Sequence, residues 1–348
     1  MVIDLSVIEG DYFRDLLEQP KALQDTLQHF EESTELKSLV ARLHKGKFTT
    51  VVLTGMGSSF HALHTLLLPL TELGIPTMLV ETSELIYYGN RLFRPDSLVV
   101  AMSQSGQSAE IIRLLEVNRK RAPIIAVTNT ADSPLARRSA ATVLTYAGQE
   151  FSVSCKTYIA GLVALKFLAD QLCRLSIART KKELQPVLGP AAEYLAGWKE
   201  HVQAMLPMLQ GIRQLFLVGR GYSLATAGTG ALILKESTQF PSEGLSSAAF
   251  RHGPFEMVSP ETFVLVFGGG SKTEKLNRRL FEDIQKHCGK GAYVHHDQPS
   301  PFRVPKVAAS LLPMLEILPV QILTLALAAM VGRQPGQFRF ASKITSTE

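Results

Sequence analysis

The sequence predicts an α/β protein that contains two tandem doubly wound parallel sheets. Short, continuous apolar runs, such as residues 50–54, alternate with helical patterns, such as residues 61–73. Such runs are typical of parallel strands that are buried on both faces and joined by helical crossovers. The arrangement repeats after about 164 residues, because residues 50–58 and 214–222 both read as a buried strand that enters a glycine turn and then a helix.

Two further strand patterns follow the first one in each half of the chain. Residues 96–102 and 123–127 form the next apolar runs in the first half, and residues 261–267 and 292–295 occupy the same places in the second half. In a doubly wound sheet, ligands bind beyond the carboxyl ends of the strands. We therefore expect the residues that follow these strands to carry the function.

The length of the chain indicates more than one domain. At 348 residues it exceeds a typical single domain. We expect a helical lead-in at residues 1–35, a first sheet domain at 36–180, a linker helix at 181–200, a second sheet domain at 201–331 and a polar tail at 332–348.

The charge pattern disfavours nucleic acid as a partner. The formal net charge is only +5, and the densest basic cluster, between Lys272 and Arg279, alternates with apolar residues as a solvated helix face does. A mildly basic chain of this kind is better suited to small anionic molecules.

The sequence predicts a cytoplasmic protein that does not enter a membrane. Its three cysteines are odd in number and lack C-x-x-C spacing, and its N-terminus has no basic region followed by a long apolar run. Residues 313–332 are apolar enough to span a membrane, but they contain Glu316 and Pro319. Because a spanning helix would have to bury that glutamate in lipid, a buried core helix is the better interpretation.

The most informative segment is the loop from Ser103 to Ser108, which follows the buried strand pattern at residues 98–102. A helix that starts directly after it would offer unpaired backbone N–H groups and a partial positive charge. Gly106 would let the backbone curve around an anion, and the serine hydroxyls would add donors. The loop contains no lysine, which favours the phosphate of a small metabolite over a nucleoside triphosphate.

Two other interpretations of these loops remain open from the residues alone. The serine loop could be an ordinary turn that caps a helix. The Gly55-x-Gly57 turn could belong to a dinucleotide site, with Glu81 as the ribose-binding acid. Phe60 stands where that fingerprint requires a third glycine, so we disfavour a nicotinamide enzyme.

At this point the chain resembles a known family, the double-SIS (sugar isomerase) proteins. It is similar from end to end to the isomerase half of glucosamine-6-phosphate synthase, whose domains have a flavodoxin-like fold. The resemblance rests on six motifs in the same order: EQP at 18–20, GSSFHA at 57–62, SQSG at 103–106, GALILKE at 230–236, RHGP at 251–254 and ASKIT at 341–345.

The resemblance implies a role for each matching residue. Glu236 would move a proton between C1 and C2 of the open-chain sugar, His252 would assist ring opening in the active site of a neighbouring subunit, and Lys343 would contact the carbonyl or form an imine with it. These types suit the chemistry, since a carboxylate can abstract a proton next to a carbonyl and histidine titrates near neutral pH. If these residues have no catalytic role, Glu236 is a charged residue on a helix surface, His252 is a histidine in a loop and Lys343 is a residue of the C-terminal tail. The phosphate would be held by Ser58, Ser59, Ser103, Gln104, Ser105 and Ser108.

Three departures from the synthase pattern point to a different reaction. We expect no glutaminase domain before residue 1, Ile233 stands where the synthase has a lysine, and Ala249 replaces an acid three residues before His252. We expect the second repeat to supply catalytic residues and the dimer contact, because residues 268–270 are glycines in place of the serine loop.

We therefore expect an isomerising glucosamine-6-phosphate deaminase that yields fructose-6-phosphate and ammonia through an enediol. A deglycase of fructosamine-6-phosphate and a non-catalytic sugar-phosphate sensor are the alternatives. We expect a homodimer with a small sugar phosphate as its partner, and no cofactor. We also expect no metal, because His61 and His64 fit helix packing and the run His295-His296-Asp297 has no further ligand evident nearby.

Overall fold

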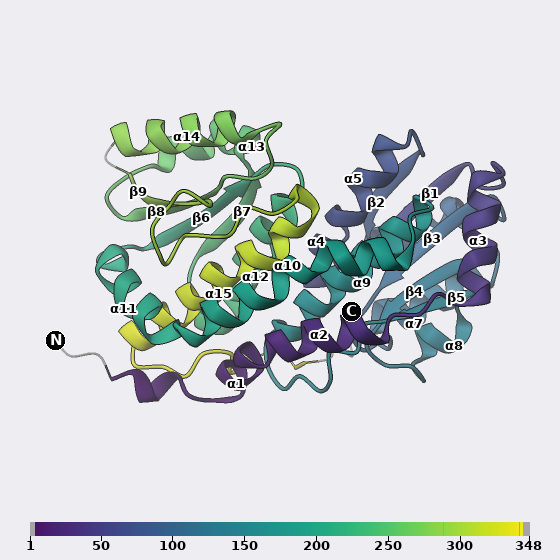
Figure 1. Ribbon diagram of the computed structural model, residues 1–348, viewed down its shortest axis with the longest axis horizontal. Helices are drawn as coiled ribbons and strands as arrows, with labels where there is room; N and C mark the ends of the chain where they lie inside the picture. The colour runs from purple at the N-terminus through teal and green to yellow at the C-terminus, as the bar shows by residue number, and fades with distance from the viewer. Residues whose placement is uncertain (1–3, 288, 341, 344–348) are drawn as a thin grey trace. The chain divides into compact units, whose positions relative to one another are not determined.

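The computed structural model (Figure 1) consists of two compact units, each built around one parallel sheet. The fold class predicted from the sequence is therefore confirmed. The structure describes residues 4–287, 289–340, 342 and 343. The first-sheet unit contains residues 21–149, 156–185, 340, 342 and 343, and the second-sheet unit contains residues 4–20, 150–155 and 186–339.

The first sheet has five parallel strands in the order β2-β1-β3-β4-β5. Strands β1 and β3 are buried almost throughout, as continuous apolar runs predict. They are neighbours, and Gly55 at the end of β1 pairs with Met102 at the end of β3. The order along the sheet reverses between these two strands, which is where doubly wound sheets bind ligands. The strands are β1 (Thr50–Gly55), β2 (Thr77–Glu81), β3 (Ser97–Met102), β4 (Ile124–Thr128) and β5 (Ala141–Leu144).

Helices cover both faces of the first sheet. Helices α4, α5 and α9 pack together, and α6, α7 and α8 form a second group. The helix predicted at residues 61–73 is interrupted at Leu63, which separates α4 from α5. The elements of this unit are α2 (Gln19–His29, which begins in the other unit), α3 (Thr34–His44), α4 (Gly57–Ala62), α5 (His64–Glu72), α6 (Thr82–Tyr87), η2 (Asn90–Leu92), α7 (Ala109–Asn118), α8 (Pro134–Arg138) and α9 (Lys156–Leu172).

The second sheet repeats this plan with four parallel strands in the order β7-β6-β8-β9. The order reverses between β6 and β8, so the end of β6 corresponds to the end of β1 and the end of β8 to the end of β3. The strands are β6 (Gln214–Gly219), β7 (Ser242–Ser246), β8 (Thr262–Phe267) and β9 (Lys290–Val294).

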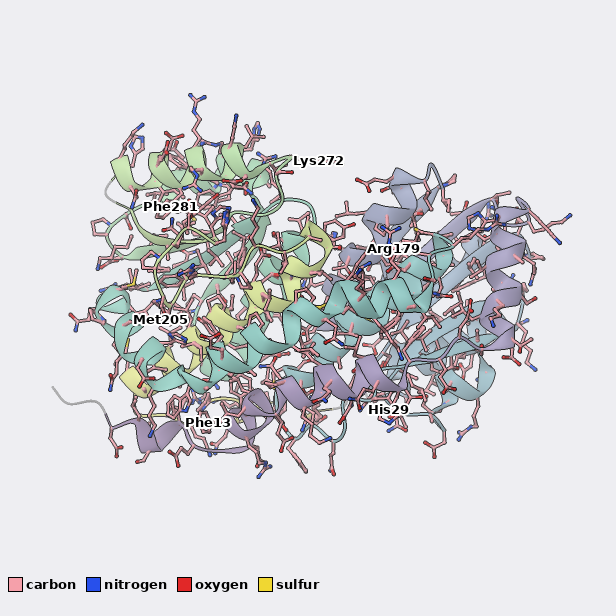
Figure 2. The ribbon with its side chains drawn as sticks, viewed as in Figure 1. Phe13, His29, Arg179, Met205, Lys272 and Phe281 are labelled. Carbon is pink, nitrogen blue, oxygen red and sulfur yellow. The ribbon has the colours of Figure 1, made fainter. Side chains whose placement is uncertain are left out.

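Helices also cover both faces of the second sheet. Helices α12 and α15 pack against each other. Phe250 of α13 and Leu280 of α14 lie in a hydrophobic core with Phe216 of β6. Phe281 of α14 packs against the same core (Figure 2). The elements are η1 (Leu5–Ile8), α1 (Asp11–Leu17), α10 (Ile177–Ala196, which begins in the other unit), α11 (Trp198–Leu209), α12 (Ser223–Thr238), α13 (Ser247–Arg251), η3 (Pro254–Met257), α14 (Glu274–Lys286), η4 (Ala309–Leu311) and α15 (Leu312–Met330).

Helix α15 is the apolar segment that the sequence analysis assigned to the core. Residues 309–330 are long and apolar enough to cross a membrane, but residues 312–329 are all buried inside the protein. The polar side chains on α15 find partners, since Gln321 exchanges hydrogen bonds with Gln19 at 2.8 and 3.0 Å and Thr324 donates to the Tyr12 hydroxyl at 3.1 Å. The prediction of a buried helix is therefore confirmed.

Candidate functional site

The serine loop lies directly after β3 and leads into α7. Ser103 Oγ accepts a hydrogen bond from the backbone N–H of Gly106 at 3.2 Å, which curves the loop back on itself. Ser108 is the N-cap residue of α7, but its hydroxyl does not cap the helix. The first N–H groups of α7 and the Ser108 hydroxyl thus remain available to an anion at the helix N-terminus.

Gly106 is required by the geometry of this loop. Its φ is +63°, in the left-handed region that favours glycine. A Cβ atom at this position would overlap the Ser133 side chain and lie 3.1 Å from Thr128 Oγ1. The loop is further fixed because Thr128 Oγ1 donates to the Gln104 carbonyl at 3.2 Å. Both the backbone angle and the lack of space therefore exclude other residues.

The Gly106→Ala variant should lose sugar-phosphate affinity by at least about ten-fold and unfold at a lower temperature, because the loop must shift to relieve the overlap. The matched control is Gly46→Ala: Gly46 has a φ of +67°, but nothing lies within 4 Å of its added Cβ. The measurement is titration calorimetry with glucose-6-phosphate, together with thermal unfolding. Equal affinity in the two variants would contradict the importance of the loop geometry.

A pocket of about 140 Å³ lies beside this loop, where β1 and β3 end. Pockets for whole drug-sized ligands are typically about 300 Å³ or more, so this one accommodates only part of a ligand, such as a phosphate group. Five of the six predicted phosphate ligands line this pocket, and Ser58 does not. The lining residues are Met56, Ser59, Met102, Ser103, Gln104, Ser105, Ser108, Glu110, Ile111 and Lys343.

Lys343 from the C-terminal segment lines the same pocket as the serine loop. Its side chain is half-buried there. An ammonium group among serine hydroxyls and helix N–H groups adds the positive charge that a phosphate dianion needs. The other residues of the ASKIT motif, apart from Ser342, lie outside the described residues.

Glu110 is a pocket residue that the sequence analysis did not identify. Its side chain is only 8% exposed, and its Oε2 has no hydrogen-bond partner among the described residues. A carboxylate repels phosphate but accepts hydrogen bonds from hydroxyl or amino groups, so Glu110 suits a polar group next to the phosphate. The residue was missed because an acid in the first turn of a helix is common for reasons of the helix dipole alone.

Glu236 and His252 belong to the second-sheet unit. Glu236 is half-buried in the last turn of α12, and His252 is exposed where α13 ends. Ile233, one turn before Glu236, is fully buried. Ala249 is exposed, and its backbone N–H donates to Ser246 Oγ at 3.0 Å. Glu236 and His252 therefore belong to the second-sheet unit, whereas the predicted phosphate ligands belong to the first-sheet unit.

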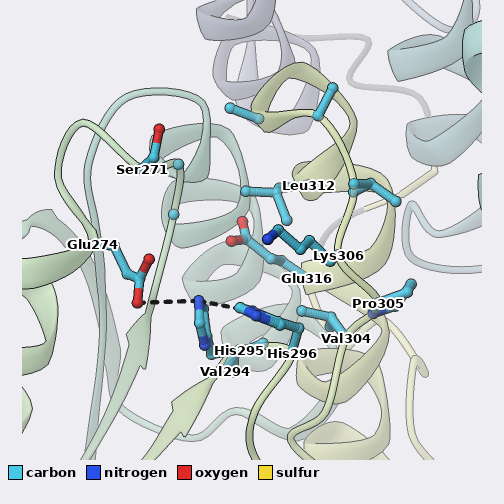
Figure 3. Close-up of a pocket in the computed structure, with 15 residues that line it drawn as sticks. Ser271, Glu274, Val294, His295, His296, Val304, Pro305, Lys306, Leu312 and Glu316 are labelled. Atoms are coloured by element: carbon cyan, nitrogen blue, oxygen red, sulfur yellow. Dashed lines mark hydrogen bonds and ion pairs between the residues drawn. The ribbon is translucent and has the colours of Figure 1, made fainter.

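The second-sheet unit has its own pocket at the carboxyl ends of β8 and β9, with a volume of about 340 Å³ (Figure 3). Its walls come from the glycine loop after β8, from the segment after β9 and from the first half of α15. The lining residues are Gly269, Gly270, Ser271, Glu274, Val294, His295, His296, Val304, Pro305, Lys306, Val307, Ala308, Ala309, Leu312 and Glu316.

The histidines of this pocket form a hydrogen-bonded network. His295 Nδ1 lies 2.7 Å from Asp297 Oδ1, and His295 Nε2 lies 3.0 Å from His296 Nδ1 and 3.5 Å from Glu274 Oε1. Hydrogen bonds from Gln298 and His295 lower the pKa of Asp297 far below its usual range. The run His295-His296-Asp297 therefore has a structural explanation in this network.

Glu316 is the other residue that the sequence analysis did not assign to a site. Its side chain is completely buried, and its Oε1 accepts a hydrogen bond from Ser223 Oγ at 2.9 Å. Burial raises the pKa of its carboxyl group to about 7, although the hydrogen bonds that it accepts act in the opposite direction. From the sequence, Glu316 served only as an argument against a membrane helix.

Comparisons with known proteins agree with this architecture. The SIS domain model matches residues 43–170 and 208–285, which is more than half of the chain. The chain therefore belongs to the SIS family, the sugar isomerase domains, and it is an enzyme of that class.

Individual relatives extend the comparison over nearly the whole chain. The glutamine–fructose-6-phosphate aminotransferase (isomerizing) of Pyrococcus horikoshii is 27% identical over 96% of this chain. A proposed phosphosugar isomerase from Silicibacter pomeroyi is 28% identical, with a TM-score of 0.76 over 93% of this chain and 99% of its own. Glucosamine-6-phosphate deaminase of Thermotoga maritima shares the fold, at 20% identity and a TM-score of 0.79 over 97% of this chain and 100% of its own.

The chain spans 57% of the length of the Pyrococcus horikoshii relative. The likeness therefore concerns only that part of the aminotransferase, and the activity of the whole relative does not transfer to this chain by similarity alone.

Proposed function

We propose that this chain is an isomerising deaminase of phosphorylated amino sugars, which converts glucosamine-6-phosphate and water into fructose-6-phosphate and ammonia. The observation that carries the proposal is the pocket at the ends of β1 and β3, where four serines, Gln104 and Lys343 surround a space of about 140 Å³. This donor set suits a phosphate monoester. Membership of the SIS family supports a sugar as the rest of the molecule.

The proposed reaction moves one proton and then releases the amine. His252 first transfers a proton during opening of the sugar ring. The Glu236 carboxylate then removes the proton from C2 of the open-chain aldehyde. The electron pair forms a C1–C2 double bond, and the carbonyl oxygen takes up a proton. Return of a proton to C1 leaves an imine at C2, and water hydrolyses this imine to the ketose and ammonia.

We also propose a compartment and an oligomeric state for this enzyme. We expect it to act in the cytoplasm without a cofactor, as a homodimer in which His252 serves the neighbouring active site. Light scattering should then give twice the chain mass of 38.2 kDa.

The test is incubation of the purified protein with glucosamine-6-phosphate, with both products quantified. Equal amounts of ammonia and fructose-6-phosphate are expected, and a Ser103→Ala, Ser105→Ala double variant should require far more substrate for the same rate. A protein that binds the substrate but releases neither product is not this deaminase. Cleavage of fructosamine-6-phosphate by that protein would identify a deglycase, and its absence would favour a sensor.

A further inference from the structure

The two pockets occupy equivalent places in the two repeats. The repeat distance of about 164 residues places Ser223 at the start of α12 where Ser59 stands in α4. The glycine loop after β8 likewise takes the place of the serine loop after β3, since β3 pairs with β1 and β8 with β6 across the point where the strand order reverses. The second repeat thus retains the two elements that form the phosphate pocket in the first repeat.

In the second repeat, a carboxylate of the protein itself is bound by these two elements. Glu316 of α15 accepts hydrogen bonds from Ser223 Oγ at 2.9 Å and from Thr226 Oγ1 at 3.4 Å, both in the first turn of α12. The backbone N–H of Gly269, in the glycine loop, also acts to lower the pKa of this carboxyl group. A hydroxyl at the N-terminus of one helix and a loop N–H are the donors that an anion site provides.

Glu316 is a buried acid for which the described part of the chain shows no ion pair. Among the described residues, no Lys, Arg or His forms an ion pair with Glu316. Buried carboxylates normally have such a partner, because removal from water is costly for a charge. The donors around Glu316 lower its pKa, as donors to an anion do, but burial has the larger effect and raises the pKa to about 7.

We propose that the second repeat contains a latent phosphate site, in which the carboxylate of Glu316 occupies the position of the anion. The site would accept a phosphate monoester or inorganic phosphate once this carboxylate is removed. This inference does not depend on the reaction proposed above.

The other residues that line this pocket suit a group larger than the carboxyl group of Glu316, such as a phosphate. The cavity of about 340 Å³ lies next to Glu316, so that space is present for a larger group. Lys306 extends into it in Figure 3, as Lys343 lines the pocket of the first repeat. Ser271 adds a hydroxyl at the other side of the cavity. The acid Glu274 opposes an anion, but it is already engaged by Arg278 at 3.2 Å.

The test uses a full-length background in which the first pocket is disabled by Ser103→Ala and Ser105→Ala. Calorimetric titration with inorganic phosphate should show no binding to this parent at millimolar concentration. Adding Glu316→Ala should create one site per chain, at least about ten-fold tighter than any residual binding in the parent, because the donors of α12 and the glycine loop are then free to bind phosphate. A further Lys306→Ala exchange should weaken the new site again.

Two controls make the result decisive. Glu316→Gln keeps the size of the side chain and an oxygen that can accept from Ser223 Oγ, so it should still fill the site and bind no phosphate although it is neutral. Glu316→Ser replaces Glu316→Ala if circular dichroism shows that the alanine variant does not fold. A folded variant with a small residue at 316 that binds no phosphate would overturn the proposal, and so would binding that is unaffected by Lys306→Ala.

Discussion

The Glu236→Gln variant is expected to lose turnover of glucosamine-6-phosphate by about a hundred- to ten-thousand-fold while it still binds the sugar phosphate. Glutamine has nearly the same size as glutamate, but it cannot accept the proton from C2. The phosphate pocket belongs to the first-sheet unit and Glu236 to the second-sheet unit, so the exchange leaves the phosphate ligands in place. Steady-state rates and calorimetric affinity, measured on the same preparation, separate the two effects.

Glu282→Gln is the matched control for this experiment. It makes the same chemical change on an exposed position of α14 and should leave both turnover and affinity unchanged. If Glu236→Gln turns over at the rate of the control, Glu236 is not the base. If it loses affinity as strongly as turnover, the residue contributes to binding or folding instead.

The Glu316→Gln variant is expected to be more stable than the wild type above neutral pH, and equally stable in acid. Burial raises the pKa of Glu316 from 4.5 to about 7, so the folded protein binds a proton that the unfolded chain releases between these values. Wild-type stability should therefore fall as the pH rises from about 4.5 to 7, by an amount on the order of 3 kcal/mol at and above about pH 8. Glutamine does not titrate, so the variant lacks this loss.

Thermal unfolding of both proteins across that pH range provides the measurement. The difference between their unfolding temperatures should grow with pH and then level off, whereas Glu282→Gln should follow the wild type at every pH. Curves for wild type and Glu316→Gln that run parallel would show that Glu316 is already charged at low pH in the folded protein.

Much of the fold could be predicted because its central strands are apolar on both faces. Strands β1, β3, β6 and β8 are short runs of mostly buried residues that end at or just before a glycine or a serine, whereas a buried run as long as α15 indicates a helix. Strands β5 and β7 were not among the elements predicted from the sequence. Both are edge strands, and the sequence of β7, SEGLS, is too polar to resemble a buried strand.

The candidate site was predictable only in part. The loop from Ser103 to Ser108 could be singled out because it is rich in serine, contains a glycine and follows a buried strand. From the residues alone it could equally have been an ordinary turn that caps a helix. Glu110 and Glu316 could not be singled out, because a single acid in a helical pattern normally points to solvent. Their roles depend on which other elements surround them, and this is a property of the tertiary structure.

The pairing of Gln19 with Gln321 has a consequence for how the protein is made. These two side chains are 302 residues apart in sequence and share two buried hydrogen bonds. During synthesis, the segment around Gln19 leaves the ribosome long before α15 exists, so it cannot form these hydrogen bonds until α15 has been translated. A nascent chain halted before residue 312 should therefore leave the segment around Gln19 open to proteases, and a chain that includes α15 should protect it.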